Sequence, residues 1–421
     1  MANYKAALIM LKTPLLAISV SLALLASQSA FADVEQRRQA KRIHDRLTGT
    51  PPGETVLNEM ESLLLTDPSG KLAAEKALED PAFYNITLKN FAAPWTNEEQ
   101  TVFTPLNDYT ATVIGMIRDD IDFRQVLSGN ILYVGDSSSL GISNYSNNNN
   151  NHYEELESLG PIIGNLADPS ILKGDSSQSD ITGLDAAATA GVMTTRAAAR
   201  AFFFKGTNRA MFRFTLMNHL CTDLEPLKDN SRIPDRVHRD VSRSPGGDSR
   251  IYLNSCVACH AGMDGFMGAY ANYSLEFTEN NDLVDESTPH LVYTAGVVQD
   301  KFLINENNFK PGHVTIDDSW INYWRNGQNA LLGWSASYAG LSLDEKGHAI
   351  GNGAKSMGME LANSEAFAQC QVKKVFQNVC LREPSNSTDR SQVGTIVTDF
   401  KADGYSMKQV FRDVAAYCKG N

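Results

Sequence analysis

One short motif constrains this chain more than any other feature of its sequence, and it reads Cys256-Val-Ala-Cys259-His260. Two thiols three positions apart on a turn of helix can reach the two vinyl groups of one haem and form thioether bonds. The adjacent histidine is then placed to give a ring nitrogen to the iron. The motif occurs once in the 421 residues. The sequence therefore predicts one covalent haem c, attached at Cys256 and Cys259, with His260 as a metal ligand.

A CxxC pair can also form a redox-active disulfide or part of a zinc site. A thioredoxin-like redox pair would need a β-α-β context, and the flanks Asn254-Ser255 and Ala261-Gly262-Met263 indicate no strand of that kind. A structural zinc site would need two more ligands at matched spacing, such as a second CxxC or an HxxxH pair. The sequence contains neither, so the haem interpretation is favoured.

The first residues have the layout of an export signal. Lys5 and Lys12 give a positive start, residues 14–26 are an almost uncharged apolar run, and Ala30-Phe31-Ala32 offers small residues at a cleavage site. The apolar run has 13 residues, whereas a membrane-spanning helix needs about 20. We therefore expect residues 1–32 to be a cleaved signal peptide, no membrane span in the mature chain, and a periplasmic or secreted protein.

The charge balance bears on the class of partner. The full chain has 37 basic and 49 acidic residues, and removal of Lys5 and Lys12 leaves 35 minus 49, or −14. A surface of this sign argues against nucleic acid as a partner.

Four cysteines remain outside the motif: Cys221, Cys370, Cys380 and Cys418. In an oxidising compartment they are expected to form disulfides. If residues 365–380 form one helix, Cys370 and Cys380 lie about 15 Å apart along it at 1.5 Å per residue. A disulfide needs Cα atoms within about 7 Å, so those two cannot pair with each other. Cys418 could then bond to either one, and Cys221 would take the other or stay free.

The rest of the chain indicates mainly helices. Apolar residues at spacings of three and four mark helices around residues 56–64 and 106–117. Further helices are predicted over 184–204 and 209–220, and three close the chain, within 365–380, 393–400 and 407–418. Short strands are predicted at 130–134 and 290–295, an exposed loop at 144–151, a long connection at 225–250, and irregular structure between 267 and 308.

The sixth ligand of the iron is harder to predict than the fifth. The candidates after the motif are Met263, Met267, Met357, Met359, His290, His313 and His348. Met357 and Met359 lie in a glycine-rich segment, 351–359, that we expect to fold as a loop over one haem face, with Met357 as the iron ligand. The alternative is that both methionines fill gaps in the core. His313 is the next candidate. Trp320, Trp324 and Trp334 are expected either at the haem edge or in the core.

Several segments resemble, in the same order, a family of bacterial single-CxxCH cytochrome c-like proteins found in planctomycetes and marine bacteria. Residues 118–127 look like its "NDRPFDELLTADY" segment, and 209–221 are similar to its "RG…ILxxxLC" helix. Residues 259–265 resemble "CHxxxDPxG", and 367–370 with 400–414 are similar to its terminal helices.

This chain also departs from the family's pattern. Gly265 replaces the usual proline, the "GFxLExFD" text that should follow is not clear, and residues 273–300 look inserted. The resemblance implies haem attachment at Cys256 and Cys259, His260 as the axial ligand, and a redox role. It supplies no established reaction.

Taken together, these features predict a mainly α protein with a helical N-terminal domain (33–234) and a cytochrome c-like haem domain (235–421) that ends in helices. The expected function is one-electron transfer with a redox partner protein. Two alternatives stay open: a haem-dependent peroxidase or oxygenase with an open iron position, and a cell-surface binding protein with a structural haem. No GxSxG, HExxH or phosphate-binding glycine loop indicates other chemistry.

Overall fold

The computed structural model describes residues 34–203, 208–280, 283–303 and 312–420. It is mainly helical, with 56% helix and 8% strand, as predicted for a mainly α protein. The expected signal peptide, residues 1–32, lies outside the described residues. Among the helices that are described, none combines the length and the apolar character needed to cross a bilayer.

The N-terminal half is built from short helices. A helix over residues 34–48 comes first. It is followed by α2 (Glu54–Thr66), α3 (Lys71–Ala77), α4 (Lys89–Ala92), α5 (Asp108–Arg118), α6 (Ser137–Leu140), α7 (Asn151–Ser158), α8 (Gly160–Ile163), α9 (Gln178–Thr182), α10 (Arg196–Ala198) and α11 (Arg209–Thr215). Strands β1 (Val134–Gly135) and β2 (Leu172–Lys173) pair antiparallel.

The C-terminal half mixes helices with two small sheets. Its helices are α12 (Ser249–Ile251), α13 (Val257–Met263), α14 (Asp300–Leu303), α15 (Gly353–Ala362), α16 (Glu365–Cys380), α17 (Ser387–Ala402) and α18 (Met407–Tyr417). Strands β3 (Tyr273–Asn280) and β4 (Leu283–Tyr293) form a hairpin. Strands β5 (Ser319–Asn322), β6 (Ser342–Leu343) and β7 (Ala349–Asn352) form a sheet in the order β5-β7-β6.

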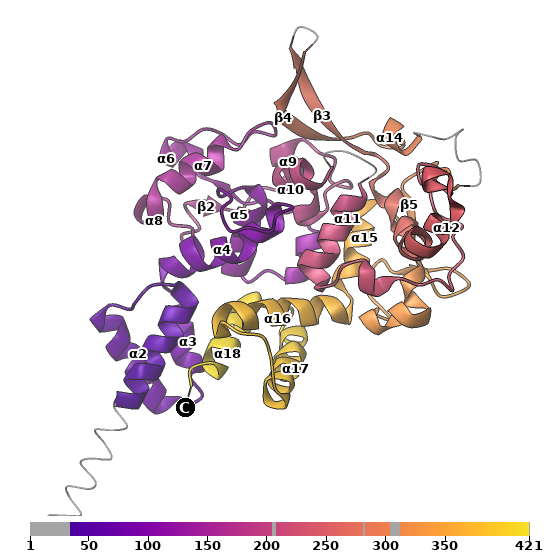
Figure 1. The fold of residues 1–421 in the computed structure, drawn as a ribbon. Coiled ribbons are helices and arrows are strands. Elements are labelled where there is room, and N and C mark those ends of the chain that lie inside the picture. The colour runs from indigo at the N-terminus through magenta and orange to yellow at the C-terminus, as the bar shows by residue number, and fades with distance from the viewer. Residues whose placement is uncertain (1–33, 204–207, 281–282, 304–311, 421) are drawn as a thin grey trace, which may run out of the picture.

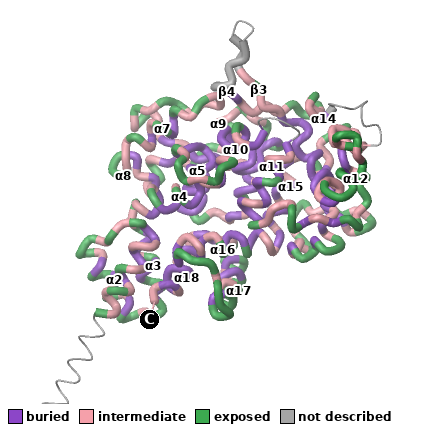
Figure 2. The backbone as a smooth tube through the Cα atoms, viewed as in Figure 1, coloured by how far each residue is buried: buried purple, intermediate pink, exposed green. Residues whose placement is uncertain are grey.

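The hydrophobic core runs through both halves of the chain. Helix α18 packs against α3, and α15 packs against the 3₁₀ turn η3 (Phe123–Leu127). Figure 2 shows α5, α10, α11 and α15 largely buried in the middle of the molecule, while α12 is exposed and α17 exposes one side. In Figure 1, α2 lies at one end and α12 at the other, with the β3–β4 hairpin projecting from the top. The predicted domain boundary at residue 234 stays a prediction.

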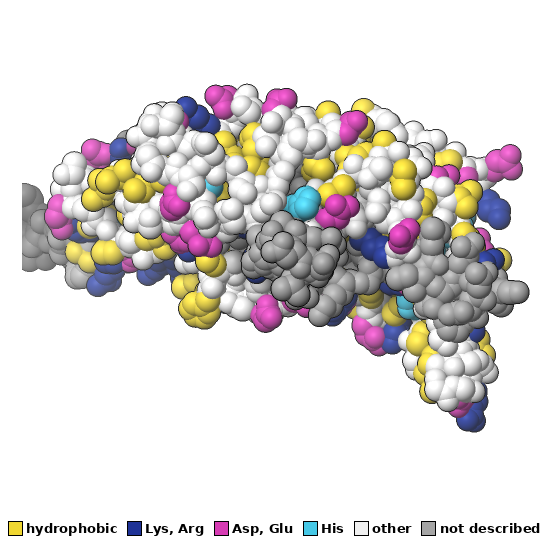
Figure 3. Space-filling model, turned by 90° about the horizontal axis from the view of Figure 1, so that it is seen from above, with side chains coloured by type: hydrophobic (Ala, Val, Ile, Leu, Met, Phe, Trp, Pro, Cys, Tyr) yellow, Lys and Arg dark blue, Asp and Glu magenta, His cyan; other side chains and the backbone are white. Residues whose placement is uncertain are grey.

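Seen from above, acidic and basic side chains are both spread over the surface (Figure 3). The net charge of −12 is therefore not gathered into one acidic patch on this face.

The three closing helices confirm the apolar periodicity of the sequence. Each buries the predicted stripe, including Phe376 on α16, Phe400 on α17 and Phe411 on α18. Side chains at spacings of three and four share one helical face, and that face is driven into the core because burying it removes apolar surface from water.

The disulfides resolve the pairing that the sequence left open. Cys221 bonds to Cys370, and Cys380 bonds to Cys418. Cys370 and Cys380 do lie on one helix and do not pair with each other, as the helical rise requires. The second bridge ties the end of α18 to the end of α16.

Other local predictions are wrong. Residues 273–280 and 283–293 form two paired strands, with a register shift between Glu276 and Thr278, whereas the sequence predicted irregular structure with one strand at 290–295. Residues 184–190 are not helical, and the short strand is at Val134–Gly135 rather than over 130–134. The hairpin was missed because its strands carry many Asp, Glu, Asn and Ser residues, which lack a clear apolar alternation.

One glycine fixes how closely the motif region approaches β5. A Cβ on Gly268 would lie 1.9 Å from the backbone oxygen of Ser319, and backbone cannot yield as a flexible side chain can. Gly268→Ala is therefore expected to lower the free energy of unfolding by about 1–3 kcal/mol. A Cβ added at Gly394, inside α17, would meet no atom within 4 Å. Gly394→Ala should therefore raise the free energy of unfolding by about 0.5–1 kcal/mol. Urea denaturation of both variants checks the opposite signs, and equal effects would contradict this packing.

Candidate functional site

The Cys256–His260 motif lies in one continuous helical run. Helix α12 leads into a π-helical turn, η9 (Tyr252–Cys256), then into α13 and the 3₁₀ turn η10 (Asp264–Tyr270). The side chain of Asp248 starts the run by accepting the backbone N–H of Arg250 at 2.9 Å. A π turn inside a helix widens the spacing of its side chains and often occurs at functional sites.

The two motif thiols are unpaired, unlike the other four cysteines. Both side chains are half-buried. Cys259 Sγ lies 3.8 Å from the backbone oxygen of Leu224, and partial burial raises the pKa of the Cys259 thiol above its ordinary value. Spacings of three and four place Cys256, Cys259 and His260 on one face of the run. The sequence prediction that these residues form one cluster is thus consistent with the local helix.

His260 is held by a carboxylate from the next turn. Its Nδ1 lies 3.1 Å from each carboxylate oxygen of Asp264, four residues further along the helix. An ionised carboxylate can only accept hydrogen bonds, so Nδ1 must carry the proton and donate it. In the neutral ring this leaves the lone pair on Nε2. Nε2 makes no hydrogen bond within the described residues.

Asp264 is completely buried and ionised. Burial alone would raise its pKa, but the Arg209 guanidinium and the hydrogen bond from His260 hold the pKa of Asp264 below its usual range. Arg209 donates to Asp264 at 2.9 and 3.1 Å and to Asp240 at 2.6 and 2.9 Å. Burial by itself would lower the pKa of Arg209, but the two carboxylates outweigh this effect and raise the pKa above its ordinary value. The guanidinium thus bridges two carboxylates, and only one of them contacts His260.

A second histidine lies behind this pair. The backbone N–H of His238 donates to Asp264 at 3.3 Å, and its Nε2 lies 3.4 Å from the Thr315 hydroxyl. Burial lowers the pKa of His238 to about 4, so its ring is neutral near neutral pH. The ring of His313 stacks on it, with centroids 5.5 Å apart. The structure therefore places the candidate His313 against His238, whose backbone contacts Asp264.

An aromatic cluster supports the motif from below. A Cβ on Gly262 would lie 2.1 Å from Trp324 Nε1, so α13 sits directly against that indole. Phe266 packs against Trp320 and Trp324, with ring centroids 6.1 and 5.3 Å apart. Trp334 is partly exposed and donates to the backbone oxygen of Trp324 at 2.8 Å. Trp320 and Trp324 are therefore buried core residues.

The structure corrects the expected loop around Met357 and Met359. Residues 349–352 form β7, and both methionines lie inside α15. Met357 is fully buried, whereas Met359 is partly exposed. No hydrogen bond joins either sulfur to Cys256, Cys259 or His260 in the part of the chain that is described. Their role as a sixth ligand stays a prediction.

The remaining candidates are occupied elsewhere or buried. Met263 and Met267 lie in the core. His348 is bound to Asp344 at 2.9 Å, and His290 is on strand β4 of the hairpin.

The described residues contain no group of three or more His, Cys, Asp or Glu side chains arranged to hold a metal ion. A structural zinc site built from the motif thiols and two further protein ligands therefore finds no support within these residues.

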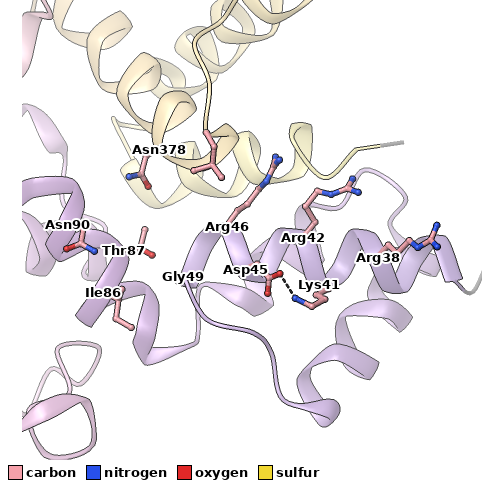
Figure 4. Close-up of a pocket in the computed structure, with 11 residues that line it drawn as sticks. Arg38, Lys41, Arg42, Asp45, Arg46, Gly49, Ile86, Thr87, Asn90 and Asn378 are labelled. Carbon is pink, nitrogen blue, oxygen red and sulfur yellow. Dashed lines mark hydrogen bonds and ion pairs between the residues drawn. The ribbon is translucent and has the colours of Figure 1, made fainter. Parts of the chain in front are cut away.

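A basic pocket lies elsewhere, at the N-terminal end of the molecule. Figure 4 shows Arg38, Lys41, Arg42 and Arg46 along the helix of residues 34–48, with Arg42 and Arg46 directed toward the C-terminal segment of the chain. Lys41 pairs with Asp45 at 2.5 Å. Arg46 donates to the backbone oxygen of Cys418 at 2.6 Å, and Arg42 donates to that of Lys419. Arg42 and Arg46 therefore compensate the partial negative charge at the C-terminal end of α18. This pocket thus stabilises the fold.

Sequence reasoning missed the groups behind His260. The spacing from His260 to Asp264 is four residues, which places both on one face of a helix, so this pair could have been found. Arg209, Asp240 and His238 reach the site from distant parts of the chain, and no local pattern indicates them. In comparisons with known proteins, no family model, no curated protein and no solved structure matches this chain.

Proposed function

We propose that this chain is an exported monohaem c-type cytochrome that transfers single electrons to or from a redox partner protein. The observation that carries the proposal is the state of its cysteines. Four are paired in disulfides, and the two unpaired thiols are those spaced for haem attachment beside a histidine with a free Nε2.

The donor set fits the group. Each thiol can add its S–H bond across one vinyl group of haem with no atom lost, which forms two thioethers. His260 offers the Nε2 lone pair from a ring whose tautomer is fixed by Asp264. When bound, the haem supplies an iron that alternates between the ferric and ferrous states.

The surface of the helical run also fits a large apolar ligand. Leu253 is 57% exposed and lies one turn before Cys256, and Ile251 is 46% exposed. Exposed apolar side chains cost free energy in water, and a porphyrin attached at the thiols offers apolar surface to cover those on the run.

The two disulfides also support an exported location for this chain. Disulfides form and persist in oxidising surroundings such as the periplasm or the cell exterior, and this chain has two. Haem attachment at a CxxCH motif is expected in the compartment to which the signal peptide would deliver the chain.

Spectra of the haem-loaded protein test the function. We expect low-spin absorption in both the oxidised and the reduced form, because an electron carrier keeps both axial positions filled. A high-spin spectrum with a free iron position would overturn electron transfer and favour the peroxidase or oxygenase alternative. Unchanged partner binding by a folded, haem-free variant would instead favour the binding protein with a structural haem.

A further inference from the structure

We propose that Asp264 is a positioning residue that lowers the reduction potential of the haem by accepting the Nδ1 proton of His260. The inference rests on the proposed function and extends it, because it assigns the direction in which the chain tunes its redox site. The haem would be held toward the ferric state, so the electron donor of this protein must be a strong reductant.

The first argument is the contact itself. Both carboxylate oxygens of Asp264 lie 3.1 Å from Nδ1 of His260, and the carboxylate has no exposed surface. A carboxylate accepting from a ligating histidine makes that ring more basic and fixes its orientation. A more basic ligand donates more electron density and stabilises the ferric form relative to the ferrous form.

The second argument is that the carboxylate is kept charged and fixed by its other contacts. Arg209 donates two hydrogen bonds to Asp264, and the backbone N–H of His238 donates a third. Asp264 therefore cannot turn away from His260 without breaking its hydrogen bonds to Arg209 and to the backbone of His238.

The third argument is the balance of charge around Arg209. The guanidinium binds Asp240 as well as Asp264, so its single positive charge is shared between two carboxylates. Of these two carboxylates, Asp264 is the one that contacts His260, so its negative charge lies next to the ring. Such a charge favours the iron state that carries the additional positive charge.

The test is the midpoint potential of the haem-loaded protein, followed by absorption during a redox titration. Asp264→Asn should shift the potential in the positive direction. The ferric-to-ferrous ratio at a fixed potential should fall at least tenfold, which is about 59 mV for a one-electron couple. The matched control is Asp240→Asn, which removes the same charge from Arg209 without touching His260, and it should change the ratio less than threefold.

A double variant separates the hydrogen bond from the charge. Arg209→Gln with Asp264→Asn removes one positive and one negative charge together, so the net charge of the site is unchanged, and Asp240 keeps its charge without the guanidinium. A positive shift that persists in this variant assigns the effect to the His260 contact. The double variant also tests the role of Asp264 if the Asp264→Asn variant does not fold.

The unmutated protein covers the case in which neither variant folds. In the diamagnetic ferrous carbon monoxide complex labelled with ¹⁵N-histidine, Nδ1 of His260 should be protonated and hydrogen-bonded. An Nδ1 without a proton, an unmoved potential in Asp264→Asn, or equal shifts in Asp264→Asn and Asp240→Asn would each overturn the inference. The intact mass is recorded first, because a chain without haem overturns the proposed function, whereas a haem-loaded chain with an unmoved potential overturns only the inference.

Discussion

Replacing Cys256 and Cys259 together with alanine is expected to abolish covalent haem attachment completely while the chain still folds. The two thiols form no disulfide, and both are half-buried on the outer face of the run, whereas the aromatic core lies beneath α13. Loss of two sulfur atoms there opens little cavity. Haem staining after denaturing electrophoresis and circular dichroism of the purified protein measure the two effects.

The matched control makes the same change in another cysteine pair. Cys380→Ala with Cys418→Ala removes the bridge between α16 and α18, which should cost about 2–4 kcal/mol of stability and leave haem attachment intact. If haem stays covalently bound in the Cys256 and Cys259 variant, attachment occurs elsewhere and the assignment of the motif is wrong.

Glu360→Gln is expected to be the most destabilising single change near the site. Glu360 is fully buried on α15, where it accepts two hydrogen bonds from Arg325 at 2.8 and 2.7 Å and one from Asn322 at 2.6 Å. Removing one partner of a buried ion pair leaves an uncompensated charge, which costs about 3–5 kcal/mol. Urea denaturation measures the loss.

An exposed ion pair between α16 and the loop that follows it is the control. Glu383 and Lys373 are 3.6 Å apart and largely exposed, so Glu383→Gln should change the unfolding free energy by less than about 1 kcal/mol. A similarly small effect for Glu360→Gln would show that α15 is not held by this pair to the 3₁₀ turn of residues 323–325, which follows β5. The position of Met357 and Met359 would then be free to change.

The fold was predictable where periodicity is strong. The closing helices carry apolar side chains at helical spacing over three or four turns, and helix α16 limited the disulfide pairings by its rise alone. The β3–β4 hairpin was not predictable, because strands that project from the molecule need no apolar face. The helix expected from residue 184 is replaced by a 3₁₀ turn at Gly191–Thr194 and by α10 from Arg196, because Asp185 and Thr194 accept local hydrogen bonds that compete with a helix.

In the candidate site, too, the residues close together in sequence were predictable and those brought in from distant segments were not. The motif thiols and His260 are local, and their shared face follows from the spacing. The groups that tune His260 are brought in by packing, since Arg209 is 55 residues from Asp264 in the chain. The loop expected at Met357 became a helix because Asn352 and Gly353 end a strand and open α15, a turn that glycine content alone does not distinguish from a loop.

The intact mass of the unmutated chain, expressed with a cytochrome c maturation system, tests the central claim most directly. The account predicts a mature chain that carries the mass of one whole haem, retained after denaturation and precipitation. A mass equal to that of the polypeptide alone would contradict it, and Cys256 and Cys259 would then be a thiol pair rather than a haem attachment site.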